Sequence, residues 1–373
     1  MRLDLPGKLN HFGVAAYNQV HLSIRVETCH SRMDALTEIL KSLRLEGAVF
    51  FNAEFTAPWA FRSPPSSEVA AFLRKGSRHV IIYHLVLAGR ARGQVEHSTR
   101  YLDLIPGDIV VFPHGDPHIF SNGRPASIVD IGKQLKEVFS QGMSLLRDGG
   151  GGESTSFVCG YMECDRELCK NLLGGLSSVF KVNILNDHAG QWMENSIKFA
   201  AEQASANLAG SEAVLARLSE ALFAETLRRY MLELPTEQTG WLAGARDPGV
   251  GAALAHLHRA PQYRWTIAGL AQHVGMSRSV LAERFRHYLG EPPMTYLSRW
   301  RLQLGARMLR STSHSVARIA GEVGYESESA FNRAFKREFG APPARFRTRD
   351  KSAREAVNMG RAQMAMHPSS SIQ

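Results

Sequence analysis

Three histidines in the first third of the chain have side chains that could bind a metal ion or a polar ligand. They are His84, His114 and His118. Imidazole nitrogens are common ligands of iron, manganese and zinc, and they also donate and accept hydrogen bonds near neutral pH. One interpretation is a metal centre, which would make the chain a metal-dependent enzyme. The other is a set of pocket or core histidines that hold no metal, and histidines in strands are more often of this kind.

Three cysteines lie within a short stretch and could respond to oxidants. They are Cys159, Cys164 and Cys169. The thiolate is the reactive form of cysteine, and the nearby charges of Arg166 and Lys170 would favour it by lowering a thiol pKa. Buried, unreactive thiols are the alternative. The chain has four cysteines in total and no CxxC pair, which is too few for a disulfide scaffold and fits a reducing compartment.

A pattern of apolar residues occurs twice in the last third of the chain. Ile267, Leu270, Ala271 and Val274 have the i, i+3, i+4, i+7 spacing of an amphipathic helix, and the same pattern returns 49 residues later at Val316, Ile319, Ala320 and Val323. Glycine ends each helix, at Gly275 and Gly324, because it can adopt the left-handed conformation of a helix stop. The sequence therefore predicts a duplicated structural unit.

A second helix follows each glycine turn. Ser277 and Ser327 are suitable N-caps, and the apolar pair Leu281 and Phe285 returns 50 residues later. A helix, a tight turn and a second helix form a helix-turn-helix, in which the second helix enters the DNA major groove. The segment between the copies, 292–311, reads as one helix of roughly 30 Å, close to the ~34 Å between successive major-groove faces.

Positive charge is concentrated in the same part of the chain. Residues 247–350 contain 16 Lys and Arg against 8 Asp and Glu, a net charge of +8, whereas the whole chain carries +9. Such an uneven distribution is typical of a domain that binds a polyanion. Together with the duplicated helix-turn-helix, it predicts that this domain binds double-stranded DNA.

This part of the sequence resembles the DNA-binding domain of AraC/XylS-family transcription regulators. The resemblance covers 247–349, and its most specific portion is Ile319–Gly340 (IAGEVGYESESAFNRAFKREFG) followed by Pro342-Pro343 and Phe346-Arg347. The resemblance implies that some side chains face DNA bases: Ser279, Ala282, Glu283, Glu328, Ser329, Asn332 and Arg333. It implies that others contact phosphates: Arg278, Arg286, Lys336 and Arg337.

The chemistry of three of these side chains agrees with base recognition. Arg333 can donate to guanine O6 and N7 together, Asn332 can pair with adenine, and Glu283 can accept from cytosine N4. Ala282 offers only a methyl contact. For each arginine, a solvated surface charge is the alternative.

The run Gly107–Asn122 (GDIVVFPHGDPHIFSN) is similar to the second motif of the cupins, G-x5-P-x-G-x2-H-x3-N, at every fixed position. Cupins are small β-barrels in which this histidine, here His118, points into the barrel. In cupin enzymes a His-x-His pair and a Glu complete a metal site, but here Ile82 takes the Glu position and no His-x-His pair precedes it. We therefore expect no metal, no cofactor and no enzymatic activity, although a site of His84, His114 and His118 stays open.

The cupin resemblance implies that the N-terminal half senses a small molecule or a stress signal. The residues that could line the effector pocket are Trp59, Phe61, His84, His114 and His118. The family further implies RNA polymerase as a partner of an activator. A thiol-based redox regulator is an alternative within the same class.

The expected fold class is α+β multidomain, with an N-terminal cupin β-barrel and helical hairpin and a C-terminal all-α domain with two helix-turn-helix units. The expected divisions are an irregular extension (1–32), the cupin-like effector domain (33–187), a helical hairpin that could form a homodimer (188–234), a linker (235–246), the double helix-turn-helix (247–349) and a disordered tail (350–373). Short apolar runs between Pro and Gly predict the strands: 48–55, 79–87, 101–104, 109–112, 127–131 and 156–162.

The ends of the chain and its apolar runs bear on location. Met33 opens the first amphipathic run and is a candidate alternative start. No apolar run approaches the 18 residues needed to span a bilayer, and the N-terminus lacks the pattern of a signal peptide. We therefore expect a cytoplasmic protein that does not enter a membrane.

Overall fold

The computed structural model describes residues 34–42, 45–69, 79–123, 127–132, 134–135, 145–164, 172–185, 187–206 and 211–349. The extension 1–32, the candidate start Met33 and the tail 350–373 lie outside the described residues. Helix α1 (Ala35–Ser42) comes first and buries the side chains of Ala35, Leu36 and Ile39.

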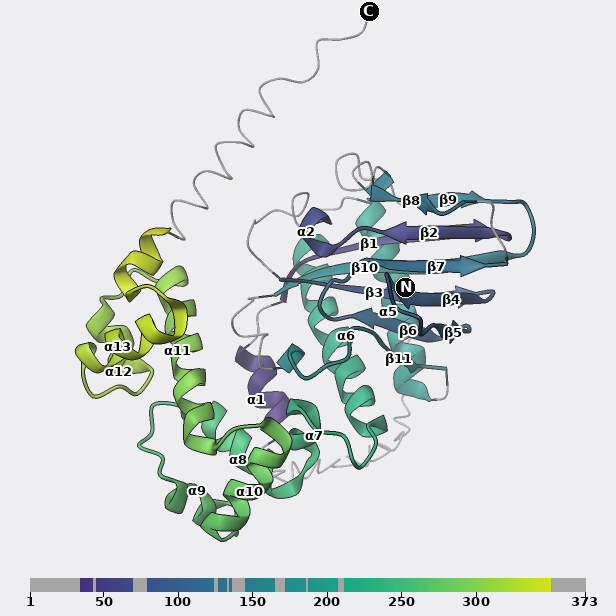
Figure 1. Cartoon of the computed structure of the whole chain (residues 1–373). Helices are drawn as coiled ribbons and strands as arrows, with labels where there is room; N and C mark the ends of the chain where they lie inside the picture. Colours follow the sequence, from purple (N-terminus) through teal and green to yellow (C-terminus); the bar gives the residue numbers. More distant parts are fainter. Residues whose placement is uncertain are drawn as a thin grey trace, which may run out of the picture. The chain divides into compact units, whose positions relative to one another are not determined.

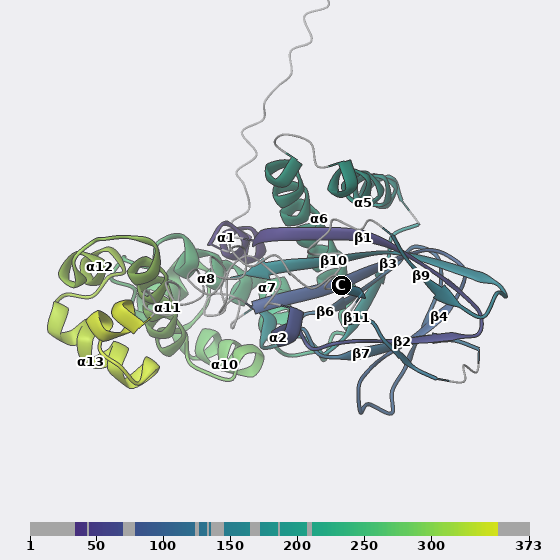
Figure 2. The same cartoon turned by 90° about the horizontal axis from the view of Figure 1, so that it is seen from above.

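Two β-sheets follow α1 and face one another (Figures 1 and 2). The larger sheet has, in spatial order, the strands β11 (Phe180–Asn183), β6 (Asp108–Phe112), β3 (His79–Ala88), β10 (Ser154–Cys164), β1 (Leu45–Thr56) and β9 (Leu145–Gly149). The smaller has β5 (Leu102–Leu104), β4 (Ala91–Val95), β7 (His118–Asn122), β2 (Trp59–Ser63) and β8 (Val129–Asp130). A short helix, α2 (Ser66–Val69), follows β2.

Alternation along β3 gives the two sides of the larger sheet different partners. Ile82 and His84 point into the space between the sheets, His84 towards β7, whereas Ile81, Tyr83 and Leu85 belong to the apolar layer that faces the helices. All five side chains are buried. The strand therefore joins an inner core between the sheets to an outer core beneath the helices.

The sheets differ from the predicted barrel in two respects. Within the described residues they share no strand, so the barrel is not closed. The short strands β2, β4 and β7 were not predicted, since each is only five residues long and β2 and β4 carry arginines that interrupt the apolar pattern. Cross-strand ion pairs fix them instead, as where Arg62 of β2 contacts Glu96 beyond β4 and Asp130 of β8.

The glycine run 149–152 is a hydrogen-bonded turn. Gly150 N–H donates to Thr56 O at 2.7 Å and Gly152 N–H donates to Ala57 O at 2.8 Å. A Cβ atom at Gly149 would lie 2.2 Å from Thr56 O, and one at Gly152 would lie 2.5 Å from Ala57 O. The glycines are needed because two backbone segments approach closely, not because the segment must move.

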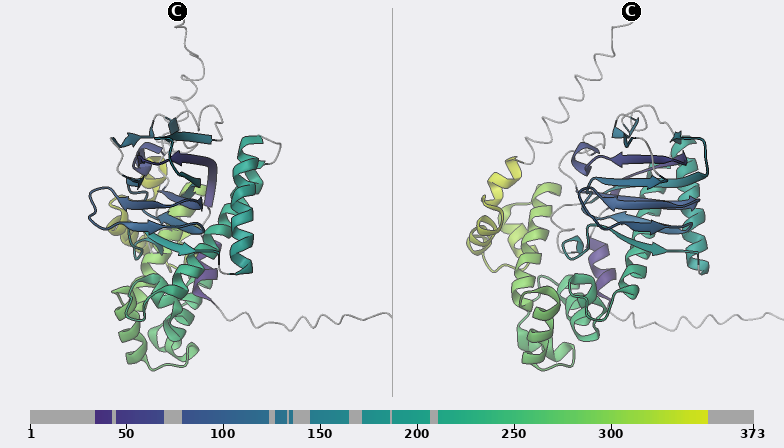
Figure 3. Two further views of the ribbon diagram at one scale, coloured as in Figure 1. Left: turned by 90° about the vertical axis from the view of Figure 1, so that its right-hand side faces the viewer. Right: turned by 45° about the vertical axis from the view of Figure 1, so that its right-hand side comes forward.

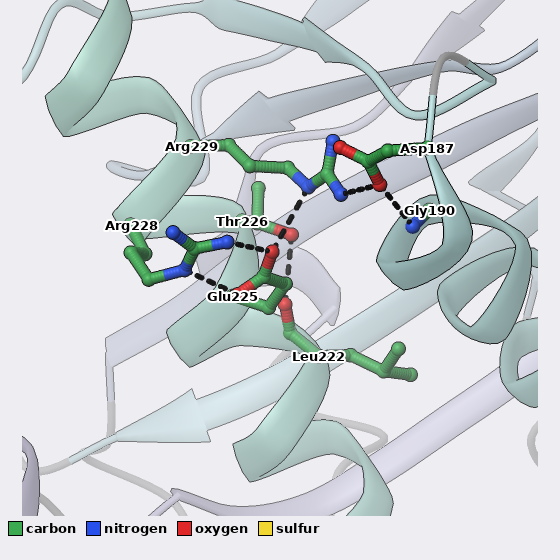
Figure 4. A network of polar contacts seen from close by, with 7 residues as sticks. All are labelled: Asp187, Gly190, Leu222, Glu225, Thr226, Arg228 and Arg229. Carbon is green, nitrogen blue, oxygen red and sulfur yellow. Dashed lines mark hydrogen bonds and ion pairs between the residues drawn. The ribbon is translucent and has the colours of Figure 1, made fainter.

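Helices α5 (His188–Ala206) and α6 (Ser211–Glu233) pack along the outer face of the larger sheet (Figure 3). Charged side chains fix the start of α5 to α6 (Figure 4). Arg229 donates to both Asp187 and Glu225, and Asp187 accepts from Gly190 N–H at 2.7 Å. Arg228 also pairs with Glu225. The two helices thus form one layer over the sheet.

The C-terminal part is entirely helical within the described residues. Its helices are α7 (Trp241–Arg246), α8 (Pro248–Arg259), α9 (Ile267–His273), α10 (Arg278–Leu289), α11 (Pro293–Ser311), α12 (Val316–Glu322) and α13 (Glu328–Phe339). The duplicated units are α9–α10 and α12–α13, and α11 connects them. With 19 residues, α11 is about 28 Å long, as its sequence predicts.

The predicted linker 235–246 is not a simple connector. Its second half is the helix α7, in which Trp241 is only 3% exposed. Trp241 Nε1–H donates to Tyr296 Oη of α11 at 2.8 Å, and Arg246 donates to the carbonyls of Leu234 and Pro235 after α6. The polar composition and two glycines suggested a linker, but the apolar residues of this segment pack into the helical core.

Candidate nucleic-acid interface

Helices α10 and α13 each bury one face in their own unit and leave the other exposed. Leu281 and Phe285 of α10 are fully buried, as are Phe331 and Phe335 of α13. Both helices are N-capped by serine, since Ser277 accepts from Val280 N–H and Ser327 accepts from Ala330 N–H. The equivalence predicted from the repeat is therefore present in the structure.

The side chains predicted to face bases lie on these two helices. Ser279 and Glu283 of α10 are exposed, as are Ser329 and Arg333 at the corresponding positions of α13. Glu328, which corresponds to Arg278, is exposed as well. Ala282 and Asn332 are partly buried beside them. Each helix therefore presents small or polar groups near its N-terminal half, which is the half that contacts base edges in helix-turn-helix proteins.

The four residues predicted to contact phosphates are exposed as well. They are Arg278, Arg286, Lys336 and Arg337. Within the part of the chain that the structure describes, none of their charged groups forms an ion pair. Their charge is therefore available to a polyanion.

Other arginines of the same domain are engaged within the protein. Arg284 pairs with Asp247, a buried carboxylate that also caps α8 by accepting from Gly249 and Val250 N–H. Arg299 pairs with Glu291, and Arg318 pairs with Glu322. The net charge of +8 alone does not distinguish these structural arginines from the available ones.

Sequence reasoning missed two exposed side chains on α10. His287 is exposed and stands 50 residues before Arg337, so the repeat itself could have added it to the candidate phosphate contacts. Val280 is 44% exposed next to Ser279 and presents an apolar surface. A valine there can contact a thymine methyl group.

Between the two sheets, four of the five residues predicted to line an effector pocket come together. Trp59, Phe61, His84 and His118 are all nearly or fully buried there. His114 is not among them, because the turn before β7 directs its Nε2 to Leu176 O, 3.1 Å away, and its ring lies near His79. The structure therefore does not assemble the three-histidine site of His84, His114 and His118.

A defined chain of hydrogen bonds runs through the inner core. His118 Nδ1–H donates to Asp116 O at 2.9 Å, so His118 Nε2 accepts the proton of His84 Nε2, also at 2.9 Å. His84 Nδ1 then accepts from the Cys159 thiol at 2.9 Å. Burial lowers the pKa of His118 to about 4 and that of His84 well below its usual value. Both rings are therefore neutral at pH 7.

Aromatic rings surround this chain. Phe112 stacks on His118 with ring centres 3.7 Å apart, and Phe120 lies 4.9 Å from the ring of His84. Trp59 and Phe61 stack with a separation of 5.8 Å. The indole Nε1–H of Trp59 is buried and has no hydrogen-bond partner among the described residues. A buried hydrogen-bond donor without a partner lowers the stability of the fold. Where a protein keeps such a donor, it often marks a site that another group completes.

Comparison with known proteins follows the same division of the chain. Residues 34–232 match the family model described as Cupin, and residues 270–349 match the model described as Helix-turn-helix domain. A putative AraC-like transcription regulator of Streptomyces lividans is 30% identical over 84% of this chain and 98% of its own length. The chain belongs to the AraC family of transcription regulators. It is a DNA-binding regulator with an N-terminal cupin domain.

Two further relatives show how far the similarity extends. The RCS-specific HTH-type transcriptional activator RclR of Escherichia coli K12 is 26% identical over 85% of this AraC-family chain and 98% of its own length. The crystal structure of the DNA-binding domain of AdpA in complex with a target DNA is 28% identical. It covers 29% of this chain and 97% of that domain, with a TM-score of 0.28.

The cysteines of this AraC-family regulator differ in state. Cys159 is a free, buried thiol, and burial raises its pKa, so the unreactive protonated form is favoured. Cys164 is disulfide-bonded, which differs from the free thiols that a reducing compartment favours. Cys169, Arg166 and Lys170 lie outside the described residues.

The described residues of the regulator also bear on a metal site and on membrane insertion. Among its described residues, no group of three His, Cys, Asp or Glu side chains is placed to hold a metal ion. In the same residues, no helix is long and apolar enough to cross a membrane.

Proposed function

We propose that this regulator reads a specific DNA sequence with both helix-turn-helix units at once. The observation that carries the proposal is the matched pair of exposed faces on α10 and α13. Bases are contacted by Ser279, Ala282, Glu283, Glu328, Ser329, Asn332 and Arg333, and phosphates are contacted by Arg278, Arg286, Lys336 and Arg337. A planar guanidinium such as that of Arg333 gives the strongest base discrimination in this set, because it bonds guanine through two atoms.

Selection of binding sites from a random DNA pool tests this proposal. The full chain should select a site with two separated boxes, one for each recognition helix. The Arg333→Ala variant should lose about 1–3 kcal/mol on the selected site and accept substitutions in one box only. An equal loss of affinity for selected and random DNA would exclude a base-reading role for Arg333.

The effector site of the proposal lies between the two sheets. Its residues are Trp59, Phe61, His84 and His118. The unpaired indole N–H of Trp59 supports a ligand that carries a hydrogen-bond acceptor. The neutral state of both buried histidines favours an uncharged effector. The stimulus itself follows from the genes next to the selected sites.

The Trp59→Phe variant tests the effector site, because it removes the indole N–H and keeps an aromatic ring. In a reporter strain exposed to the stimulus, it should show a weakened response and an unchanged level of DNA binding without the stimulus. A full response from Trp59→Phe would remove Trp59 from the effector site.

A thiol-based redox response is the second candidate, favoured by the disulfide at Cys164. The name of the Escherichia coli relative, an RCS-specific activator, points in the same direction. In this case DNA affinity should differ between the purified protein with and without a thiol reductant, and Cys164→Ser should abolish the difference. Equal affinities under both conditions would exclude this candidate.

We also propose that the regulator has no enzymatic activity and that it forms a homodimer. Support for the homodimer comes from Trp192 and Phe199, which are 47% and 44% exposed and lie seven residues apart on one side of α5. Trp192→Glu should shift the elution of the full chain from dimer to monomer on a sizing column.

We further propose that the regulator activates transcription by contacting RNA polymerase. Because a bacterial regulator acts on the chromosome, the proposed location of the protein is the cytoplasm.

A further inference from the structure

The two glycine turns of the repeat have the same backbone conformation but different surroundings. Gly275 has φ +66° and Gly324 has φ +93°. A Cβ atom at Gly275 would meet nothing within 4 Å. One at Gly324 would lie 2.8 Å from the Cα of Gln262 and 3.0 Å from the guanidinium carbon of Arg301. The turn of the second unit therefore packs against α11 and the loop that precedes the first unit, whereas the turn of the first unit is open.

Arg301 is the side chain at this contact. It lies in α11, the helix between the units, and its guanidinium reaches back to the loop between α8 and α9. Its Nε–H donates to Pro261 O at 2.7 Å and its Nη2–H donates to Tyr263 O at 2.8 Å. Two carbonyls of one loop are thus held by one planar group, whose other side lies against Gly324.

The loop that Arg301 holds is itself ordered by the first unit. Trp265 Nε1–H donates to Ala260 O at 2.9 Å, and its ring packs against Tyr263 with centres 4.6 Å apart. Trp265 also contacts His256 of α8 and His273 of α9. A displacement of this loop would therefore disturb the first unit. The Arg301 contact thus couples the position of the second unit to that of the first.

We propose that Arg301, seated against Gly324, fixes the spacing and the rotational phase of the two helix-turn-helix units and is thereby a positioning residue for DNA binding. The nearby pair Arg264 and Glu326 also joins the units, but it is long at 3.4 Å and both side chains are largely exposed. Such pairs contribute little. The fork of Arg301 carries the connection, since an arginine can bond two acceptors in one plane and a lysine cannot.

The consequence of a fixed geometry is bivalent binding. Two recognition helices that are held at the correct separation bind as one unit, so that the second contact forms at a high effective concentration. A looser connection lowers affinity for a site with the correct spacing. It also allows the two units to bind a site in which the distance between the two DNA boxes has changed. The inference rests on the proposal that both units bind DNA together.

The test measures the dependence of binding on the distance between the two boxes. The probes are a duplex selected by the full chain and the same duplex with two base pairs inserted between the boxes, which turns one box by about 70° relative to the other. The wild-type chain should bind the lengthened duplex about 100-fold more weakly. Arg301→Ala should lose about 10-fold on the selected duplex and little on the lengthened one, so that its ratio falls to about 10.

Four further variants separate the positioning role from stability. Arg301→Lys keeps the charge but not the fork and should behave like Arg301→Ala. Gly324→Ala should also lower the ratio, whereas Gly275→Ala carries the same backbone strain without the contact and should keep it. Arg318→Ala removes an arginine that pairs only within α12 and should keep it too. Melting temperatures show that each variant is folded.

The inference is overturned if folded Arg301→Lys and Gly324→Ala keep the wild-type ratio. An equal loss of affinity on both duplexes would be such a result, because a merely stabilising contact would weaken both complexes by the same factor. If the wild-type chain itself binds both duplexes equally, the two units do not act together, and the proposed function fails with the positioning role. A ratio that is high for the wild type, Gly275→Ala and Arg318→Ala and lower for Arg301→Lys and Gly324→Ala would support both proposals.

Discussion

Individual side chains of the DNA-binding domain divide into those that hold the protein together and those that remain for DNA. Arg284 and Asp247 belong to the first kind, because their ion pair lies beside the cap of α8. Lys336 and Arg337 belong to the second, since no ion pair engages them within the described residues. Residues of equal formal charge therefore have different roles. Substitution of Arg284 should affect stability, whereas substitution of Lys336 or Arg337 should affect DNA binding.

Lys336→Ala should weaken binding to all DNA by a similar factor. The side chain is exposed on α13, and we propose that it contacts the DNA backbone rather than the bases. The slope of log affinity against log salt concentration should become shallower by about 0.9, the contribution of one phosphate contact. Titrations at several salt concentrations measure this slope, with Arg318→Ala as the control. An unchanged slope would remove Lys336 from the phosphate contacts.

The buried histidines should make the cupin domain sensitive to acid. The pKa of His118 is about 4 in the folded chain and about 6.5 when unfolded, so the unfolded chain binds more protons between these values. Stability should therefore fall as the pH decreases from 6.5 to 4, by up to about 3 kcal/mol from His118. Melting temperatures over this range should fall less steeply for His118→Gln. The exposed His287→Gln variant should follow the wild type, and an equally steep fall in His118→Gln would contradict the assignment.

At the scale of elements, helix caps decide where the helices of the DNA-binding domain begin. Asp247 caps α8 and pairs with Arg284, and it is 6% exposed. Asp247→Ala should lower the free energy of unfolding by about 2 kcal/mol, since it removes a cap and leaves Arg284 without its partner. Arg284→Ala should cost less, because the cap remains and Arg284 is itself partly exposed. Chemical denaturation of both variants provides the comparison, and a larger loss for Arg284→Ala would contradict this order.

The helices of the repeat could be predicted closely from the sequence because their evidence is local. The serine cap Ser277 placed the start of α10, and the interpretation of 292–311 as one helix placed α11 within a residue of its observed bounds. The β-region was harder. Arg62 pairs with residues 34 and 68 positions away, and no local pattern reveals such partners.

The candidate sites show the same limit. His84 and His118 could be identified as interior residues from alternation and the cupin motif. His114 could not be placed, because its direction depends on the turn at Pro113–Gly115. Arg301 was missed entirely, since its role requires a loop 40 residues earlier and a glycine 23 residues later to meet in space.

At the scale of the whole molecule, the metal content of the protein tests whether the N-terminal half is an enzyme or a sensor domain. An enzyme of the cupin type would carry a metal, whereas the proposed regulator needs none. Elemental analysis of the purified full chain should find iron, manganese, nickel and zinc at well below one atom per chain. A stoichiometric metal that is lost in a His118→Gln variant would instead favour the enzyme.

The central claim is that one chain places two recognition helices on one face of DNA. Hydroxyl-radical footprinting of the full chain on its selected site tests this claim most directly. For each bound chain we predict two protected patches, separated by about one helical turn of 10–10.5 base pairs and lying on the same side of the duplex. A single protected patch per chain, with the second box fully cleaved at saturating protein, would contradict it.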